Sequence, residues 1–345
     1  MTTYKDSGVD IEMGDKCSQI AYQAAKNTFI GRKGMIGEPV IDDGGFAGAL
    51  DMGDYYLVQN DDGVGSKSLV AEKIGKYDTL GYDLIAMVAD DAVCIGAETI
   101  SITNTIDVPK VDEKRITQMM AGLEKAALEQ KIVIPGGEIA ELGEMLTGYI
   151  WNATAVGIVK KEKLIKTDQI KEGDKIIGLN SDGFRSNGFS LVRHILNEKL
   201  GEQWPFEKFN SNFTWGEKVL IPSKIYSNAV LSIHGRFNES PKVQIKAIAH
   251  ITGGGIPGNI ARVLKKSGLG ANINALPTPH EVMQKLIELG NVETEEAYKT
   301  WNMGVGMILI ASPENVNQIQ DILSTNNVES QLIGEVTTGK IILDI

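Results

Sequence analysis

The hydrophobic residues of this chain recur with helical spacing in some segments and alternate with polar residues in others. Apolar positions three or four residues apart predict helices over residues 12–29, 79–96, 111–130, 216–234, 257–266 and 279–289. A two-residue alternation predicts a long strand over residues 149–160. Because strands and helices alternate through both halves, we expect an α/β or α+β fold.

Glycines cluster directly after several apolar, strand-like runs. Four such runs and the glycine-rich segments that follow them occupy residues 55–59 and 61–67, 131–134 and 135–138, 174–179 and 181–188, and 243–251 and 252–255. Glycine allows the backbone to turn sharply and to approach a ligand closely. We therefore expect these segments to be loops at strand ends, and to carry the chemistry.

A polar, lysine-rich stretch at residues 160–173 separates two halves of similar size. It lies between the predicted strand that ends at Lys160 and a new strand that starts at Asp174. We place the boundary within it, which predicts an N-terminal domain at residues 1–168 and a C-terminal domain at residues 169–345.

The composition excludes several classes of protein. The chain has 345 residues, and its 34 Lys and Arg against 45 Asp and Glu leave a net charge of −11 with His neutral. Such an acidic protein lacks the basic face that binds nucleic acid. It has no membrane-spanning run and no signal-peptide core, so a membrane or secreted protein is not expected. With only Cys17 and Cys94, we expect a reducing, cytoplasmic environment, with Cys94 buried as a small apolar residue.

Carboxylates are concentrated in the first half of the chain, at Asp61, Asp62, Asp83, Asp90, Asp91 and Glu138. Asp83 and Asp90 are seven residues apart, which places them on one face of the predicted helix. Carboxylate oxygens are the ligands that Mg²⁺ prefers, usually together with phosphates and water. The alternative is that these acids only solvate or cap a helix. For Asp90 and Asp91 the apolar surroundings disfavour that alternative, because adjacent charges there need a cation or a donor.

The segment Asp61-Asp-Gly-Val-Gly-Ser-Lys67 resembles a phosphate loop only superficially. It matches neither the Walker spacing nor Gly-x-Gly-x-x-Gly, although Lys67 would suit a phosphate as a point charge. In the second half, Ser186-Asn-Gly188 and His250-Ile-Thr-Gly-Gly-Gly255 combine hydroxyl, amide and backbone N–H groups. Three glycines before a helix favour an anion-binding nest, with a flexible turn as the alternative. His250 would otherwise be a core histidine.

Together these motifs resemble the phosphoribosylformylglycinamidine cyclo-ligase, or aminoimidazole ribonucleotide synthetase, family over nearly the whole chain. The resemblance rests on Asp62-Gly-Val-Gly-Ser-Lys67, Asp78 to Met87, Gly136-Gly-Glu138, Ser186 to Arg193, Ala249 to Gly255, and Asn302-Met-Gly-Val-Gly-Met307. The first loop is shared with a wider ATP-using superfamily that includes thiamine-phosphate kinase. The second-half motifs are specific to the cyclo-ligase.

The resemblance implies two α/β domains, the first binding ATP and pairing its sheet with that of a second subunit in a homodimer, the second binding the substrate's phosphate. The implied reaction is ATP + formylglycinamidine ribonucleotide → aminoimidazole ribonucleotide + ADP + phosphate, the fifth step of purine synthesis. Mg²⁺ accompanies ATP, and a K⁺ requirement stays open. The alternatives are a related superfamily kinase and a nucleotide-binding paralogue that is non-catalytic or acts on an altered substrate.

The resemblance also assigns roles to residues of this sequence. Mg²⁺ ligands would be Asp62, Asp91 and Glu138. The residues expected around ATP are Asp62, Gly63, Gly65, Lys67, Asp83, Asp90, Asp91, Gly137 and Glu138. Those expected around the ribonucleotide are Ser186, Asn187, Gly188, His250, Thr252, Gly253, Gly254 and Gly255. Asp62, Lys67, Asp91 and Arg185 are expected to act in catalysis.

The chain departs from the family pattern at Asp61, Asp90 and Arg185. Family members usually have Thr in place of Asp61, Asn in place of Asp90 and His in place of Arg185. The extra carboxylates make the local field more negative. Arg185 is expected either to clamp a phosphate, with a charge that does not titrate near neutral pH, or to be a neutral replacement on a solvated loop.

Overall fold

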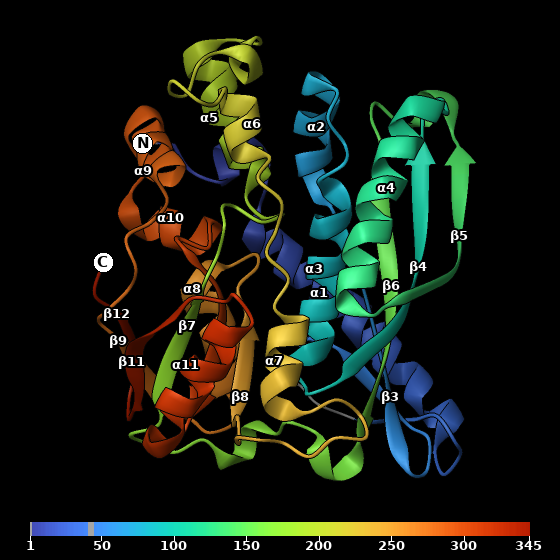
Figure 1. Cartoon of the computed structure of the whole chain (residues 1–345), viewed down its shortest axis with the longest axis vertical. Helices are drawn as coiled ribbons and strands as arrows, with labels where there is room; N and C mark the ends of the chain where they lie inside the picture. Colours follow the sequence, from blue (N-terminus) through green and yellow to red (C-terminus); the bar gives the residue numbers. More distant parts are fainter. Residues whose placement is uncertain (1, 41–44) are drawn as a thin grey trace.

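A computed structural model describes residues 2–40 and 45–345. Within these residues the strands form two six-stranded sheets, one from each half of the chain, which lie side by side in Figure 1. The predicted domain boundary falls between them, in the segment that joins the last strand of the first sheet to the first strand of the second. None of the helices in the described part of the chain is both long and apolar enough to cross a bilayer.

The first sheet has the strand order β1-β2-β3-β6-β4-β5. Its strands are β1 (Glu38–Val40), β2 (Gly48–Asp51), β3 (Tyr55–Gly63), β4 (Glu98–Val108), β5 (Val133–Glu141) and β6 (Ile150–Lys160). Only β4 and β5 pair in parallel; the other neighbours are antiparallel. Helices α3 (Leu80–Val93) and α4 (Glu113–Gln130) pack on one face of this sheet. The alternation predicted for residues 149–160 is confirmed, with Trp151, Ala153 and Ala155 buried beneath those helices.

The second sheet has the strand order β12-β9-β11-β7-β10-β8, with only β12 and β9 parallel. Its strands are β7 (Lys175–Asn180), β8 (Ala247–His250), β9 (Gly270–Ile273), β10 (Val305–Ala311), β11 (Ser330–Thr337) and β12 (Ile341–Leu343). Helices cover both faces, so β10 is buried at every residue. Helices α7 (Ser227–His234) and α11 (Val316–Thr325) lie on one face. Helices α5 (Phe189–Leu200) and α8 (Gly255–Leu264) lie on the other.

The remaining α-helices are α1 (Ile11–Thr28), α2 (Ser68–Ile74), α6 (Trp215–Val219), α9 (Glu281–Gly290) and α10 (Thr294–Thr300). The helices predicted over 12–29, 79–96, 111–130, 257–266 and 279–289 are confirmed to within a few residues at their ends. The single helix predicted over 216–234 is wrong. It is divided into α6 and α7 around Pro222, which has no N–H for a helical hydrogen bond.

Two of the predicted glycine loops are also wrong in part. Strand β5 runs on through Gly136 and Gly137 to Glu141, and β3 includes Asp61, Asp62 and Gly63. In both strands the apolar run marks only the first part of a longer strand, because backbone pairing with neighbouring strands continues into the polar residues. The acids at these positions therefore sit on a rigid sheet rather than on mobile loops.

Helices α3 and α4 cross at two glycines. A Cβ on Gly81 would collide with the backbone of Leu123, and one on Gly122 would collide with the carbonyl of Asp78. Only glycine allows the two backbones to approach this closely. The crossing fixes α3 against the first sheet, and α3 is the helix that carries Asp83, Asp90 and Asp91.

A buried histidine at the end of α7 gives the fold a pH dependence. The Nε2 atom of His234 lies 2.8 Å from the carbonyl oxygen of Lys163, and burial, followed by the charge of Lys163, lowers the pKa of His234 from 6.5 to about 4. Below pH 6.5 His234 binds a proton in the unfolded chain, whereas in the folded chain it stays neutral until the pH approaches 4. This residue therefore lowers the free energy of unfolding as the pH falls from 6.5 to about 4, by up to ~1.4 kcal/mol per pH unit.

Urea denaturation of the wild type and of His234→Asn over this pH range checks the prediction. We expect the stability advantage of the wild type to shrink as the pH falls, because the variant has no group that titrates there. An advantage of equal size at pH values above and below this window would contradict it.

Candidate active site

Helix α3 presents its acidic residues to the second half of the chain. Asp83 and Asp90 are fully buried, and together with Met87 they lie on one face of the helix, at positions i, i+7 and i+4. The partners of Asp83, Asp90 and Asp91 come largely from residues 185–250. This face of α3 therefore holds the two halves together through a row of buried carboxylates.

Lys67 is the partner of Asp83. Its ammonium group is completely buried, 2.8 Å from Asp83 Oδ1 and 2.7 Å from the carbonyl oxygen of Ile221, and the N–H of Ser223 donates to the same carboxylate. Burial lowers the pKa of Lys67, and the charge of Asp83 opposes that shift. A buried ammonium needs such partners. In this structure Lys67 is engaged within the protein, and the expectation that it faces a phosphate is not met.

Arg185 is the partner of Asp90. Its guanidinium is buried, 2.6 Å from Asp90 Oδ2 and 2.9 Å from the carbonyl oxygen of Gly306, with the ring of Tyr226 at 4.8 Å. The other oxygen of Asp90 accepts the N–H groups of Tyr226 and Ser227 at the start of α7. The expectation of a solvated loop residue is wrong, because Arg185 is buried. Its charge is paired with Asp90 inside the protein, and the expected phosphate clamp stays a prediction.

His250 on β8 is the partner of Asp91. Its Nδ1 atom lies 2.7 Å from Asp91 Oδ1, and its ring is fully buried. Burial raises the pKa of Asp91 to about 7, against the opposing charges of Arg262 and Arg185, and lowers the pKa of His250 to about 3. His250 is thus a neutral, core histidine that orients Asp91. Direct contact between the residue assigned to Mg²⁺ and one assigned to the ribonucleotide was not expected.

Asp62 lies at the end of β3, close to Asp91. Burial, followed by the charges of Asp91 and Asp61, raises the pKa of Asp62 to about 6, although the N–H of Gly63 donates to it at 2.7 Å. The carboxylates of Asp62 and Asp91 are close together, and both have raised pKa values. Such a pair of oxygen ligands suits a hard cation. The carboxylate of Asp61 accepts a hydrogen bond from Thr154 on β6 instead.

Glu138 does not join this pair. Gly63 on β3 pairs with Asn152 on β6, Asn152 pairs with Thr105 on β4, and Thr105 pairs with Glu138 on β5. Three strand spacings, about 14 Å, therefore separate Gly63 from Glu138. Among residues 2–40 and 45–345 no three His, Cys, Asp or Glu side chains form a metal-binding group. The expected set of Asp62, Asp91 and Glu138 is therefore not assembled within one chain, because β6 and β4 lie between β3 and β5.

The glycine loop of the first half meets the Ser-Asn-Gly loop of the second. Gly65 has a φ of +65°, and its Cβ position lies 3.7 Å from the carbonyl oxygen of Ser186. The amide of Asn187 is 3.8 Å from the sulfur of Met87 on α3. A Cβ on Gly188 would collide with the ring of Trp301, so glycine is required where α5 begins. Sequence motifs about 120 residues apart are thus side by side.

The Thr252–Gly255 turn leads into α8 as predicted. Gly254 precedes the helix with a φ of +90°, and a Cβ on Gly255 would collide with the carbonyl of Tyr298. The N–H of Gly255 donates to the carbonyl of Thr252, and the buried amide of Asn259 donates to three carbonyls of the turn. Of the predicted anion nest, Gly255 is therefore engaged in the turn, whereas Gly253 is exposed.

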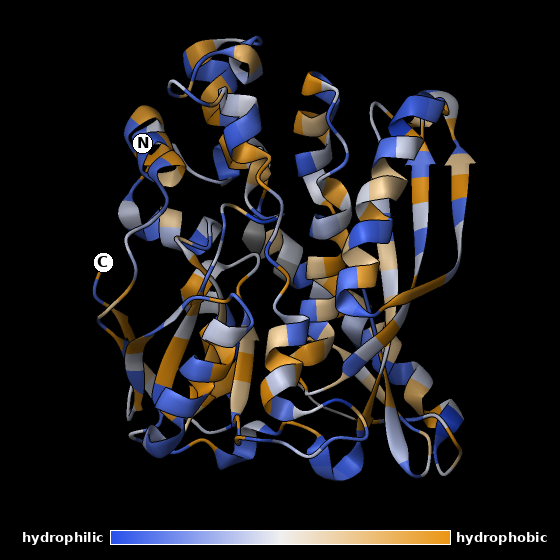
Figure 2. Ribbon diagram, in the orientation of Figure 1, coloured by the Kyte–Doolittle hydropathy of each residue, from blue (hydrophilic) through white to orange (hydrophobic). Residues whose placement is uncertain are grey.

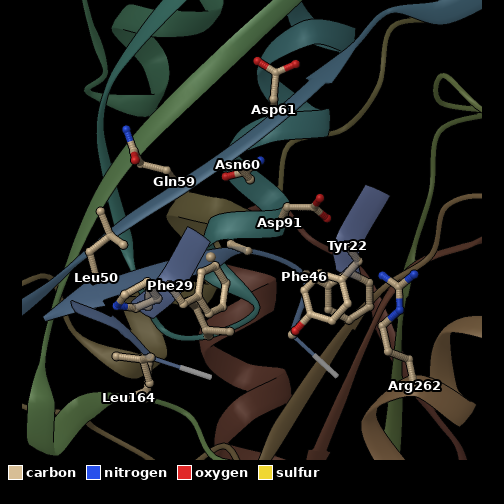
Figure 3. Close-up of a pocket in the computed structure, with 17 residues that line it drawn as sticks. Tyr22, Phe29, Phe46, Leu50, Gln59, Asn60, Asp61, Asp91, Leu164 and Arg262 are labelled. Atoms are coloured by element: carbon tan, nitrogen blue, oxygen red, sulfur yellow. The ribbon is translucent and has the colours of Figure 1, made fainter. Parts of the chain in front are cut away.

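A cavity of about 620 Å³ opens beside Asp91 (Figure 3). Asn60, Asp61 and Asp91 form its polar side, and Tyr22, Phe29, Phe46, Leu50 and Leu164 supply aromatic and aliphatic walls. Arg262 on α8 also reaches it. Sequence reasoning missed Phe46, Asn259 and Arg262. For Asn259 and Arg262, the one feature of the sequence that could have indicated a role is their spacing after the run of three glycines.

Comparison with known proteins identifies the family. Models of the AIR synthase related protein match residues 44–159 (N-terminal domain) and 171–344 (C-terminal domain). The chain is 38% identical to the phosphoribosylformylglycinamidine cyclo-ligase of Pyrococcus furiosus, over 94% of this chain and 92% of that one. It is also 38% identical to that of Methanocaldococcus jannaschii, over 97% and 92%. The chain belongs to the phosphoribosylformylglycinamidine cyclo-ligase family.

Solved structures with much lower identity share the fold. The hydrogenase maturation protein HypE of E. coli has a TM-score of 0.62 at 17% identity, covering 83% of this chain and 81% of that one. Thiamine-monophosphate kinase from Stenotrophomonas maltophilia has a TM-score of 0.59 at 15% identity, covering 92% and 95%. T. maritima PurL complexed with FGAR has a TM-score of 0.59 at 13% identity, covering 92% and 48%.

Family membership gives the two departures at Asp90 and Arg185 a common explanation. Where the resemblance leads one to expect Asn and His, this chain has an acid and a base that form one ion pair between α3 and the second half. Either charge alone would be buried without a partner, so the two replacements depend on each other.

Proposed function

We propose that this protein is an enzyme of purine biosynthesis that converts formylglycinamidine ribonucleotide and ATP into aminoimidazole ribonucleotide, ADP and phosphate. The observation that carries the proposal is 38% identity with cyclo-ligases over nearly the full length of both chains. The contact between the first-half acids on α3 and the second-half loops supports it, because a reaction between two substrates needs both halves at one site.

The reaction needs an activated amide. In it, ATP transfers its γ-phosphoryl group to the amide oxygen, which is a poor leaving group, and the amidine nitrogen then closes the ring and expels phosphate. The chemistry asks the protein for positioning and for stabilisation of charge. Asp62 and Asp91 would hold Mg²⁺, which would neutralise charge on the phosphates of ATP. His250 holds the carboxylate of Asp91 in place through the 2.7 Å contact.

The cavity beside Asp91 is the proposed nucleotide site. Its volume of about 620 Å³ suits a ligand the size of a nucleotide. A nucleotide base would pack against the aromatic rings of Tyr22, Phe29 and Phe46. The metal-bound phosphates would lie at the end of the cavity that Asp61 and Asp91 line. The turn at Gly253, which is exposed, and Gly254, together with Ser186 and Asn187, would hold the ribonucleotide and its phosphate.

The proposal includes a homodimer formed through the first sheet, in the cytoplasm. Strand β5 is an edge strand, and eight of its nine residues are exposed. Val133, Ile139 and the neighbouring Ile100 and Ile150 on β4 and β6 expose 63%, 44%, 38% and 44% of their surfaces. Figure 2 shows apolar residues along β5. An exposed apolar edge of this kind needs a partner, for which a second copy of the sheet is the best fit.

The alternatives make different predictions in one assay. A cyclo-ligase releases ADP in steady state only when formylglycinamidine ribonucleotide is present, and forms aminoimidazole ribonucleotide in equal amount. A superfamily kinase would use another acceptor, and a non-catalytic paralogue would bind ATP without turnover. Purified protein that binds ATP but fails to release ADP with this substrate would overturn the proposal.

A substitution of Thr252 tests whether the first half binds ATP and the second half binds the ribonucleotide. We expect Thr252→Val to raise KM for the ribonucleotide at least about tenfold, as the loss of a hydrogen bond to a charged group does, while KM for ATP changes little. His250 cannot serve for this test, because it also positions Asp91. Steady-state kinetics with each substrate varied in turn gives both constants. Equal rises in the two KM values would reject the division.

A further inference from the structure

Arg262 brings a positive charge from the second half into the proposed nucleotide cavity. It lies on α8, and of the 17 described residues that line the cavity it is the only Lys or Arg. Figure 3 shows Arg262 and Asp91, from two different helices, reaching the same side of the cavity. The charge of Arg262 lowers the pKa values of both Asp91 and His250, which places it within electrostatic range of that pair.

Among the residues that the structure describes, the guanidinium of Arg262 has a stacking partner but no counter-charge. It lies 4.7 Å from the ring centre of Phe46, and stacking of this kind directs a guanidinium without using its N–H donors. Within residues 2–40 and 45–345 no carboxylate forms an ion pair with it and no acceptor takes a hydrogen bond from it. A planar guanidinium beside a cavity, with no donor taken up by a described residue, is suited to two oxygen atoms of a phosphate.

The position of Arg262 along α8 indicates whether it would bind the phosphate of the ribonucleotide or a phosphate of ATP. Gly255 begins the helix, and the turn before it is the proposed site of the ribonucleotide phosphate. Arg262 follows seven residues later, two helical turns or about 10 Å along the axis. It also lies beside Asp91, which the proposed function assigns to metal-bound ATP. One helix therefore carries a group for the ribonucleotide at its start and a group for the nucleotide near its end.

We propose that Arg262 is a catalytic residue that binds the γ-phosphoryl group of ATP while it is transferred. The proposal rests on the proposed function. In the step, the bond between the γ-phosphorus and the bridging oxygen of ADP breaks and a bond from the γ-phosphorus to the amide oxygen forms, so ADP leaves with the electron pair. Arg262 donates to the non-bridging oxygens of the transferred group, whose charge is redistributed in the transition state.

Two variants and one control test this assignment. Arg262→Met keeps much of the side chain's apolar length and removes the charge, and Arg262→Lys keeps the charge but not the planar fork. The control is Lys265→Met, which removes an exposed charge from the end of the same helix. Arg262 is itself exposed, so none of these substitutions disturbs the core.

Calorimetry with the Mg²⁺ complexes of ADP and of the non-hydrolysable analogue AMPPNP separates the γ-phosphate from the rest of the nucleotide. For Arg262→Met we expect the affinity for AMPPNP to fall at least about tenfold and the affinity for ADP to change by less than about threefold. We expect kcat to fall about a hundredfold or more, with a smaller loss for Arg262→Lys and none for Lys265→Met.

Three outcomes overturn the assignment, and a fourth overturns the proposed reaction instead. Equal losses of ADP and AMPPNP affinity would place Arg262 on the base, ribose or diphosphate, and unchanged binding and kcat would remove it from the site. A wild type that does not bind AMPPNP would also refute it. If the wild type binds AMPPNP more tightly than Arg262→Met does but shows no ADP release with the ribonucleotide, Arg262 still recognises the γ-phosphate and the proposed reaction is what fails.

Discussion

Replacement of Arg185 by Met is expected to lower the free energy of unfolding by about 3–5 kcal/mol, because it leaves the buried carboxylate of Asp90 without its counter-charge. Asp90→Asn is expected to cost a similar amount, since the guanidinium of Arg185 is equally buried. The double variant Asp90→Asn/Arg185→Met should cost much less than the sum of the two, because it buries no unpaired charge. Urea denaturation of all four proteins measures the coupling.

The resemblance to the family suggests a second double variant, Asp90→Asn/Arg185→His, which introduces at once the residues that it leads one to expect at both positions. We expect it to be more stable than Asp90→Asn alone. The matched control is Lys161→Met, which breaks an ion pair of similar length, 2.6 Å, between half-exposed side chains and is expected to have a far smaller effect. Additive costs for Asp90 and Arg185 would show that the contact in the structure carries no coupling.

Asp62→Asn is expected to lower kcat at least about thirtyfold, equivalent to ~2 kcal/mol of transition-state stabilisation, because it removes one of the two carboxylates proposed for metal-bound ATP. The fold should be retained. Burial and the charges of Asp91 and Asp61 already raise the pKa of Asp62 to about 6, so a neutral amide of the same shape relieves repulsion rather than creating it.

Initial rates at saturating Mg²⁺ and ATP, together with urea denaturation, separate these two effects. Asp54→Asn is the matched control, because Asp54 is an exposed aspartate at the turn before β3 and lies on no proposed site. An unchanged kcat for Asp62→Asn would remove Asp62 from the site. A large loss of stability with no specific loss of kcat would give it a structural role instead.

The sequence by itself determined the local elements and the motifs. Apolar periodicity located α3, α4, α8 and α9, because burial of one helix face requires that spacing wherever the helix packs. It also located α1, although none of the described side chains of α1 is buried. The alternation over residues 149–160 located β6 for the same reason. The glycines before α8 also revealed their turn, since a left-handed backbone at Gly254 is a local requirement.

Only the tertiary structure decided which charges meet. Asp90 and Arg185 are 95 residues apart, Asp91 and His250 are 159 apart, and no periodicity connects either pair. The strand order inserts β6 and β4 between Asp62 and Glu138 and so divides the expected metal set. The same packing buries Lys67 against Asp83 and the segment after Ile221, and places Arg262 in the cavity. A side chain's type shows which partner it needs, but the long-range packing of helices and strands determines which partner lies within reach.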